Sequence, residues 1–355
     1  MSETADGSAF VRFPRLTPGG SRLPRLEAQL LLILIGMWIT FALISPDVFP
    51  TEGTTENLLR QGGILLVVAM GQMLVLIIGG FDISVGANMG FTATVAALMS
   101  DDVGLAVAVL IALAGGAAAG LINGIVVAKL RVNPFIATLG MLTFLGGLAN
   151  QISKGSSVAI LDENFAWLGA NDWGPIPATA GIAAIVAALA YVLLNRLRAG
   201  LYIYSIGGSR ETSRLSGIPV ARYEVLAYTL SGLLAAVGGV MLASRTGVGQ
   251  ASLGTGYELL SIATAVIGGA AIGGGVGRLL GVVLGVAILT VLTSGLEIAG
   301  MSEFARQMVT GAVLVGAVVF NQRVRRGTWR LLRPPSSQPT STRSAETPEQ
   351  QKEEA

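Results

Sequence analysis

The stretch IIGGFDISVGANMG, residues 77–90, lies between two long apolar runs. Asp82 is its only ionisable side chain, and Gly79, Gly80 and Gly86 surround it. A carboxylate is costly in an apolar medium unless it has polar partners. The solvent that surrounds this part of the chain therefore decides the fold class.

The composition of the whole chain indicates that this solvent is lipid. Of the 355 residues, 52% are hydrophobic and only 12% are charged, whereas a soluble domain carries about a quarter charged residues. The 48 glycines suit helices that pack closely in a bilayer. The chain has no cysteine and no histidine, which excludes disulfides, thiol chemistry and histidine metal sites. The net charge of +2 gives no indication of a nucleic-acid partner.

A transmembrane helix needs about 20 predominantly apolar residues, and the chain offers about ten such segments. The predicted spans are residues 29–45, 61–79, 83–100, 104–128, 134–152, 176–194, 224–244, 257–275, 278–297 and 303–320. The first span is not a cleaved signal peptide, because no A-x-A-like site follows it. The sequence thus predicts an all-α integral membrane protein.

The basic residues predict the orientation of the spans. Lysines and arginines gather at 12–25 and 323–333, and in the connections at 129–131 and 196–222. With the amino terminus in the cytoplasm, all four groups fall on the cytoplasmic side, as the positive-inside rule requires. Basic stretches at both ends favour an even number of spans and two cytoplasmic termini, in the inner or plasma membrane of the cell.

The chain divides into two tails and one membrane domain. Residues 1–27 are rich in proline, serine and charge, and cannot bury a core. They are predicted to be a disordered cytoplasmic tail, and residues 323–355 a basic and then disordered one. The transmembrane domain covers residues 28–322 and includes a long polar connection at 195–225.

This connection, NRLRAGLYIYSIGGSRETSRLSGIPVARYEV, is too polar to span a bilayer. Gly207 and Gly208 are predicted to open a turn, residues 209–216 to form a short helix, and Gly217 with a nearby proline to stop it. A short helix with one apolar edge and a charged face suits a groove on another protein. The alternative is an amphipathic loop that rests on lipid headgroups.

Four ordered blocks of the sequence resemble the permeases of ABC importers of the ribose and xylose type. GGFDISVG at 79–86 is similar to that family's G-G-I-D-L-S-V-G, and NPFIATLGMLTFLGGLA at 133–149 looks like its P-x-F-I-x-T-L-G segment. GTGYELLSIATAVIGGAAIGGGVGRLLG at 254–281 resembles its G-x-G-Y-E-L segment. Residues 200–232 look like its coupling-helix region, with matches at Gly200, Tyr204, Gly207, Arg214, Ser216, Gly217 and Ile218.

The resemblance implies a permease of about ten spans, built from two related halves of opposite orientation. It implies three protein partners: an ABC ATPase subunit, an extracytoplasmic sugar-binding protein and a second permease copy, identical or similar. The permease is expected to carry no cofactor, because ATP and Mg²⁺ belong to the ATPase. Its remaining partner is the lipid bilayer.

The resemblance and the residue pattern together give two sets of candidate site residues. The candidate contacts with the ATPase are Gly207, Gly208, Ser209, Arg210, Glu211, Arg214, Leu215, Ser216, Gly217 and Ile218. The candidate translocation pathway or gate comprises Asp82, Ser84, Gly86, Asn133, Pro134, Phe135, Thr138, Tyr257 and Glu258.

Asp82 has two readings. By the span count, residues 79–86 lie at the inner end of the second span, where the chain turns back. Asp82 is then expected to cap the third span, with Ser84 in the same cap, because a carboxylate accepts the free N–H groups of a helix start. The functional reading is that Asp82 lines the substrate path or its inner gate.

The energy for transport is expected to come from another chain. The sequence contains no G-x-x-x-x-G-K-[ST] loop for nucleotide phosphates. The main alternative is a secondary carrier driven by an ion gradient. Such a carrier usually shows ionisable relays or broken helices at the middle of the membrane, and the mid-span positions of this chain carry almost no charge. A lipid-linked transferase would need clustered loop carboxylates for Mg²⁺. These observations predict a non-enzymatic transport subunit, and the resemblance implies that its solute is a pentose, hexose or related monosaccharide.

Overall fold

The computed structural model describes residues 23–313, 315, 316 and 319. Its helices are α1 (Leu23–Ile44), α2 (Glu52–Ile77), α3 (Val85–Val103), α4 (Leu105–Ala128), α5 (Pro134–Ser153), α6 (Ala178–Asn195), α7 (Arg198–Gly208), α8 (Arg210–Leu215), α9 (Val220–Thr246), α10 (Tyr257–Ile267) and α11 (Leu279–Ile298). Residues 303–313 are helical as well. The predicted tails lie outside the described residues except for residues 23–27, which belong to α1.

The helical, membrane-spanning class is confirmed. Among the described residues, seven helices are long and apolar enough to cross a bilayer, namely α1, α2, α4, α5, α6, α9 and α11. By contrast, α10 has 11 residues, which extend about 16 Å, roughly half of the hydrocarbon core. The predicted helix over 257–275 is therefore wrong in its second part. Gly274 and Gly275 in the loop that follows have φ angles of +82° and +75°, which a right-handed helix does not allow.

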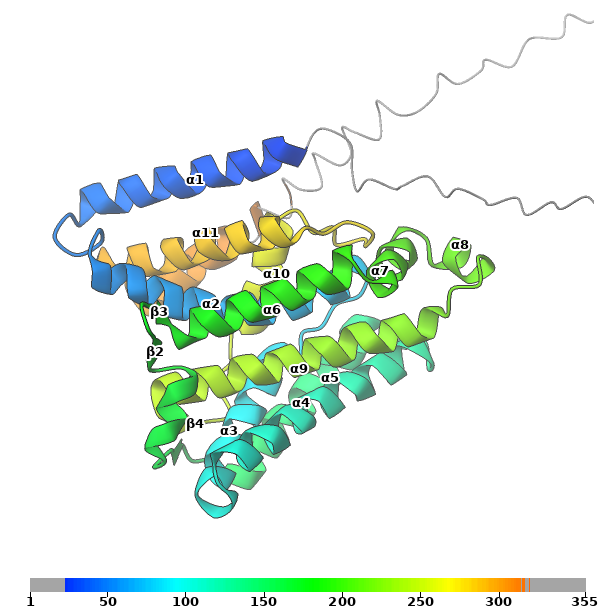
Figure 1. Ribbon diagram of the computed structural model, residues 1–355, viewed down its shortest axis with the longest axis horizontal. Helices are drawn as coiled ribbons and strands as arrows, with labels where there is room; N and C mark the ends of the chain where they lie inside the picture. The colour runs from blue at the N-terminus through cyan, green and yellow to red at the C-terminus, as the bar shows by residue number, and fades with distance from the viewer. Residues whose placement is uncertain (1–22, 314, 317–318, 320–355) are drawn as a thin grey trace, which may run out of the picture.

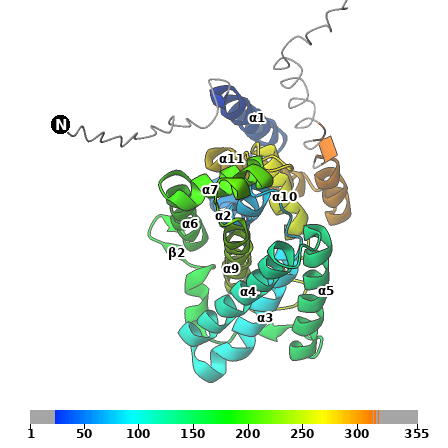
Figure 2. The same cartoon turned by 90° about the vertical axis from the view of Figure 1, so that its right-hand side faces the viewer.

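The bundle is organised around α9. This helix packs against α2, α3 and α4, and the end-on view in Figure 2 shows them around it. The outlying helix α1 lies against α11 (Figure 1). The short helix α8 projects from one end of the bundle, and the small strands lie at the other (Figure 1). These two ends are called the α8 end and the β end.

Glycines allow α4 and α9 to approach each other closely. A β-carbon on Gly120 of α4 would overlap the backbone oxygen of Tyr228, and one on Gly232 of α9 would overlap the oxygen of Gly116. Asn88 of α3 adds a hydrogen bond at this crossing, from its Nδ2 to the oxygen of Gly232 at 3.0 Å. Because lipid provides no hydrophobic drive for helix association, such close backbone packing is a main source of stability in a membrane bundle.

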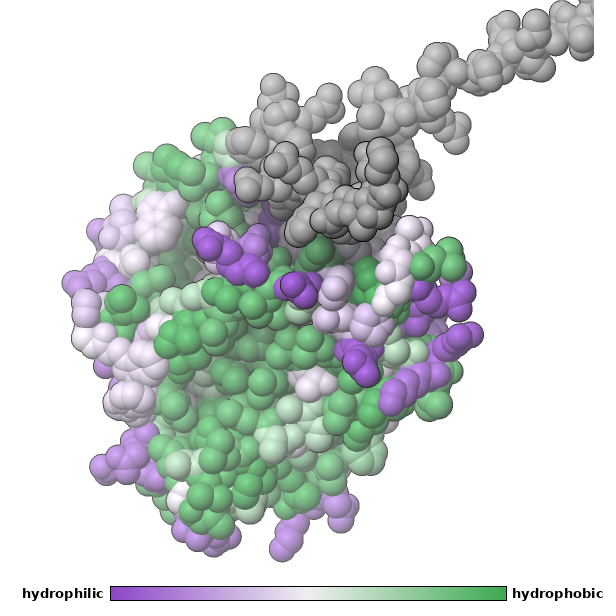
Figure 3. All heavy atoms as spheres, turned by 45° about the vertical axis from the view of Figure 1, so that its right-hand side comes forward, coloured by the Kyte–Doolittle hydropathy of each residue, from purple (hydrophilic) through white to green (hydrophobic). Residues whose placement is uncertain are grey.

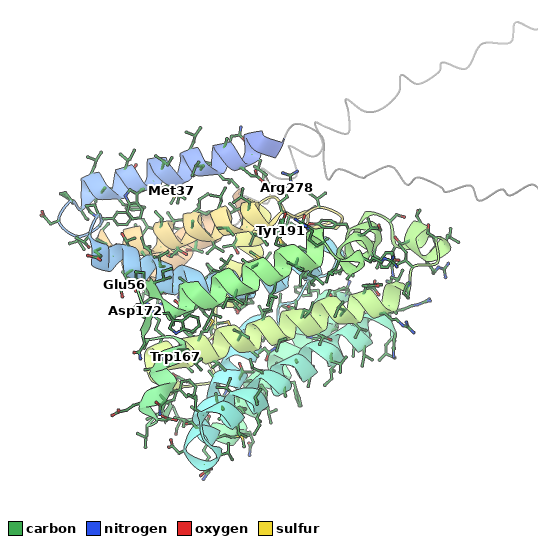
Figure 4. The ribbon with its side chains drawn as sticks, viewed as in Figure 1. Met37, Glu56, Trp167, Asp172, Tyr191 and Arg278 are labelled. Atoms are coloured by element: carbon green, nitrogen blue, oxygen red, sulfur yellow. The ribbon has the colours of Figure 1, made fainter. Side chains whose placement is uncertain are left out.

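An ion-pair cluster holds the β end together. Here β1 (Val158–Ala159) pairs antiparallel with β4 (Val248–Gly249), and β2 (Asp172–Trp173) with β3 (Ile176–Pro177). Arg60 of α2 places Nη2 2.5 Å from Glu56 Oε1 and 2.7 Å from Asp172 Oδ1. Figure 4 shows Glu56, Asp172 and Trp167 together at this end. The cluster thus ties the start of α2 to the connection between α5 and α6.

The outer surface of the bundle is apolar between two polar ends. Figure 3 shows a broad hydrophobic face flanked by hydrophilic residues. Leu32 on α1, Leu110 on α4 and Phe144 on α5 are 69%, 65% and 62% exposed. Large apolar side chains exposed in this number are unusual for a soluble protein, and they give the bundle a surface that lipid solvates.

The contact between α4 and α9 generates a stability prediction. Gly120→Ala is expected to destabilise the protein, because the added methyl group overlaps backbone atoms and overpacking costs about 1–3 kcal/mol. Gly140→Ala on α5 is the matched control, since nothing lies within 4 Å of its added β-carbon and alanine favours a helix. The fraction of each variant that stays monodisperse in detergent after heating measures its stability. Equal heat resistance of the two variants would contradict the close contact.

Candidate functional site

The chain between α2 and α3 is unwound and enters the bundle. Residues 78–84, the first unwound segment, carry Asp82, which is fully buried. Its Oδ2 accepts a hydrogen bond from Ser231 Oγ at 2.9 Å, and Ser231 lies well inside α9. The prediction that this stretch forms a simple reversal at the end of a span is therefore wrong. The chain instead carries the carboxylate into the interior before α3 begins.

The Asp82 carboxylate is satisfied by neighbouring donors. Its Oδ1 accepts the Ser84 N–H at 3.0 Å and the Ser84 hydroxyl at 2.6 Å. Asn123 of α4 donates in turn from Nδ2 to Ser84 Oγ at 2.9 Å. Asp82 thus binds the residue just before α3, as a cap at the start of that helix would, but Ser84 makes no capping bond of its own. Three hydrogen bonds to the carboxylate offset the cost of burying it.

Side chains of α9 and α5 hold the backbone of the first unwound segment. Tyr228 of α9 donates its hydroxyl to the oxygen of Phe81 at 3.2 Å. The Ile83 N–H donates to Thr138 Oγ1 of α5 at 3.3 Å. Backbone groups that leave a helix inside a bundle need such partners, because lipid offers none. The structure thus brings the predicted residues Asp82, Ser84 and Thr138 together.

A second unwound segment, residues 247–256, connects α9 to α10 and runs beside α3. Its Gly254 lies so close to Gly86 that a β-carbon on either would overlap the other segment. Glu258, at the start of α10, accepts the Gly256 N–H on both carboxylate oxygens at 3.1 Å. A β-carbon on Gly86 would also overlap the Glu258 carboxylate. Gly86 and Glu258, predicted together as pathway residues, are therefore neighbours.

A polar pocket of about 290 Å³ opens where α3, α5 and the second unwound segment meet. Its polar lining consists of Asn150, Ser156, Gln250, Ser252, Thr255 and Glu258. Amide, hydroxyl and carboxylate groups of this kind match the hydrogen-bonding groups of a polyhydroxylated solute. The pocket lies beside Gly146 of α5, a helix whose surface is otherwise largely exposed and apolar.

Four of the other predicted pathway residues do not line this pocket. Asn133 accepts the Phe135 N–H on Oδ1 at 2.9 Å and so caps α5, with Pro134 as the first helical residue. Phe135 is 53% exposed. Tyr257 is half-buried beside Glu258, packed among the apolar side chains of the core.

The predicted helix over 209–216 is present as α8 with its two flanking residues. Ser209 Oγ accepts the Thr212 N–H at 3.2 Å and begins the helix, and Gly217 follows with a φ of +78°. Arg214 pairs with Glu211 at 2.7 Å, with both side chains exposed. Leu215 is 78% exposed. An exposed apolar side chain on a capped, charged helix is suited to a groove on another protein.

The predicted turn at Gly207 and Gly208 is wrong, because these residues end α7. The reason is tertiary packing: a β-carbon on Gly207 would overlap the oxygen of Ile77, the last residue of α2. That oxygen accepts the Gly275 N–H at 2.7 Å. Gly79, Gly207, Gly274 and Gly275 therefore meet in one place, called the glycine junction.

A tyrosine of α7 strengthens the glycine junction. Tyr204 donates its hydroxyl to the oxygen of Gly277 at 2.7 Å. Burial raises the pKa of the Tyr204 phenol above its usual value of 10.0, so the group stays protonated and able to donate. Helix α7 thus contacts both the start of the first unwound segment and the loop after α10.

The sequence reasoning missed three functional candidates on α9, namely Glu224, Tyr228 and Ser231. They recur at i, i+4 and i+7 along α9, and all three are buried. Polar residues at helical spacing inside a span are a detectable signal, because they share one face of the helix. That face is the one that holds the first unwound segment.

The comparisons with known proteins agree with this geometry. Residues 54–318 match the family described as branched-chain amino acid transport system / permease component. The chain belongs to this family of transport permeases, and it is a transport component rather than an enzyme. No solved structure matches the chain.

Individual relatives are import permeases for sugars. The ribose import permease protein RbsC of Escherichia coli (strain K12) is 37% identical over 303 residues, which cover 84% of this chain and 94% of the relative. The L-arabinose transport system permease protein AraH of the same strain is 35% identical over 304 residues, covering 81% and 90%. The galactose/methyl galactoside import permease protein MglC of Haemophilus influenzae (strain ATCC 51907 / DSM 11121 / KW20 / Rd) is 33% identical over 314 residues, covering 82% and 91%.

These relatives confirm the resemblance to sugar-importer permeases, and they favour that function over an ion-gradient-driven carrier. Together with the seven apolar helices, they identify the chain as a multi-pass protein of the inner membrane. The class of importer implies an ATPase and a binding protein as partners.

The glycine junction generates a prediction with neighbouring residues as test and control. Gly207→Ala is expected to loosen the junction, because its β-carbon overlaps the Ile77 oxygen, whereas nothing lies within 4 Å of a β-carbon on Gly208. Hydrogen–deuterium exchange of peptides that cover residues 77–80 and 274–277 measures the effect. Exchange is expected to rise in Gly207→Ala and to stay at the wild-type rate in Gly208→Ala. The same rate in all three proteins would show that no such junction exists.

Proposed function

We propose that this chain is the membrane-spanning subunit of an ATP-driven importer that carries a monosaccharide delivered by an extracytoplasmic binding protein. The observation that carries the proposal is the extensive similarity to permeases named for ribose, L-arabinose and galactose. These sugars share a ring of hydroxyl groups, and the polar pocket beside Glu258 offers matching groups. ATP and Mg²⁺ belong to the separate ATPase subunit.

The exposed helix α8 is the proposed contact with the ATPase. Leu215 and the Arg214–Glu211 pair supply the apolar and charged parts of this contact. The attachment of α7 to the glycine junction supports the proposal, because a force on α8 reaches the end of α2 and the loop before α11 through α7. The proposed mechanism is conformational: the ATPase moves α8, and the bundle alternates between outward and inward openings.

The α8 end of the bundle is proposed to face the cytoplasm. The arginines at 196–222 lie at this end and support the orientation through the positive-inside rule. The same rule supports two cytoplasmic termini, and hence about ten spans in which α3, α10 and the helix that starts at residue 303 join the seven long helices. The working unit is proposed to contain a second permease copy, identical or similar to this chain.

The solute path is proposed to pass the polar pocket rather than the Asp82 carboxylate. The carboxylate is fully buried and bonded on both oxygens, which supports a structural role. Glu258 is half-buried and lines the pocket. A pocket of hydroxyl and amide groups suits brief, weak contacts with a solute that another protein selects.

Reconstitution tests the proposed function. Proteoliposomes that hold the permease and its ATPase are expected to accumulate sugar only with binding protein outside and ATP inside. Uptake by the permease alone, driven by a sodium or proton gradient, would contradict the proposal.

The same preparation tests α8 with a matched pair of variants. Leu215→Ser is expected to abolish binding of the ATPase and therefore sugar uptake, because this leucine is 78% exposed at the α8 end. Leu161→Ser is the control, since Leu161 is 75% exposed at the β end. Co-purification of the ATPase with each variant measures the effect. Retention of the ATPase by Leu215→Ser would exclude this leucine from the contact.

A further inference from the structure

One face of α9 carries a line of polar contacts that reaches from α8 to the centre of the bundle. Glu224 Oε2 pairs with Arg210 Nη2 of α8 at 2.8 Å. Tyr228 donates its hydroxyl to the oxygen of Phe81, and Ser231 donates to Asp82. The three α9 residues are spaced i, i+4 and i+7, so they occupy one face of the helix. Glu224 therefore connects α9 to α8, and Tyr228 and Ser231 connect it to the first unwound segment.

The two ends of this line are anchored by buried carboxyl groups. The side chain of Glu224 is 8% exposed, whereas that of Arg210 is 53% exposed. Because the Glu224 carboxylate is buried, loss of its Arg210 partner would leave that group without the cation that offsets its burial. A displacement of Arg210 with α8 therefore draws Glu224 and the start of α9 along with it. At the other end, Asp82 would lose a donor if Ser231 moved without it.

Between these ends, α9 is a stiff connector. From Glu224 to Ser231 the helix extends about 10 Å, and every residue between them is helical. Tyr228 lies at the middle of this stretch and is fully buried. Its hydroxyl also lies against Gly80, where a β-carbon would overlap it. The tyrosine thus fixes the position of Gly80 and Phe81 along the axis of α9.

We propose that Glu224, Tyr228 and Ser231 transmit the displacement of α8 to the first unwound segment, with Tyr228 as the positioning residue. This line acts beside the glycine junction. The junction moves the α2 end of the segment, and α9 moves its centre, so the segment shifts as a unit and changes the packing of Gly86 against the second unwound segment and Glu258. The proposal rests on the proposed function only in taking α8 as the ATPase contact.

The isosteric variant Tyr228→Phe tests this line in the complete complex of permease, ATPase and binding protein. It removes only the hydroxyl that bonds to Phe81 and keeps the ring that fills the core. Sugar taken up per ATP hydrolysed is expected to fall about three- to tenfold, the range that one lost hydrogen bond produces. Assembly with the ATPase is expected to persist, because Tyr228 is fully buried and is not part of the exposed surface of α8. Tyr191→Phe on the exposed face of α6 is the matched control.

A second variant keeps the test informative if Tyr228→Phe fails to insert. Glu224→Gln preserves the side-chain volume and removes the ion pair with Arg210. It is therefore expected to lower the amount of sugar taken up per ATP hydrolysed. A purely structural role would reduce the amount of folded complex without changing the ratio. Wild-type ratios in both variants would overturn the proposal while ATP-driven uptake by the wild type upholds the proposed function. Absence of any ATP-driven uptake by the wild type would instead overturn the proposed function.

Discussion

The arrangement of this protein depends on one buried carboxylate. Asp82 lies on a stretch without helical hydrogen bonds, in a bundle whose surroundings are lipid and apolar side chains. A charge in such a place is tolerated only where donors surround it. The hydroxyl groups of Ser84 and Ser231 and one backbone N–H supply them. The position of the first unwound segment is therefore fixed relative to α9, and through α9 relative to α8.

The second constraint on the structure is the position of its glycines, because only residues without a side chain let unwound backbone pass between closely packed helices. The first unwound segment meets α7 and the loop after α10 at the glycine junction, and it leads into α3 where Gly86 meets Gly254. Non-helical backbone at membrane depth is stable only where protein covers it or where it lines a polar cavity. Here protein covers the first unwound segment, and the second lines the polar pocket. Interrupted helices of this kind are a common origin of binding sites in transporters.

The sequence predicted the features that are local and missed those that depend on distant contacts. The apolar spans, α8 and its stop at Gly217 follow from composition and capping rules. The end of α7 at Gly208 does not, because Gly207 is fixed by its contact with Ile77 rather than by its neighbours in sequence. The sequence also does not predict how deep Asp82 lies in the bundle, since a hairpin at a helix end and a segment in the interior share the same local pattern. The donor that distinguishes them, Ser231, is 149 residues away.

A double-mutant cycle between Asp82 and Ser231 tests the central claim most directly. The unfolding free energies of Asp82→Ala, Ser231→Ala and the double variant would be measured against the wild type in detergent. A buried, charge-assisted hydrogen bond predicts a coupling of at least about 1 kcal/mol, so the double variant loses less than the sum of the single losses. Strictly additive losses would show that the two side chains do not meet, and the position assigned to the unwound segment would then be wrong.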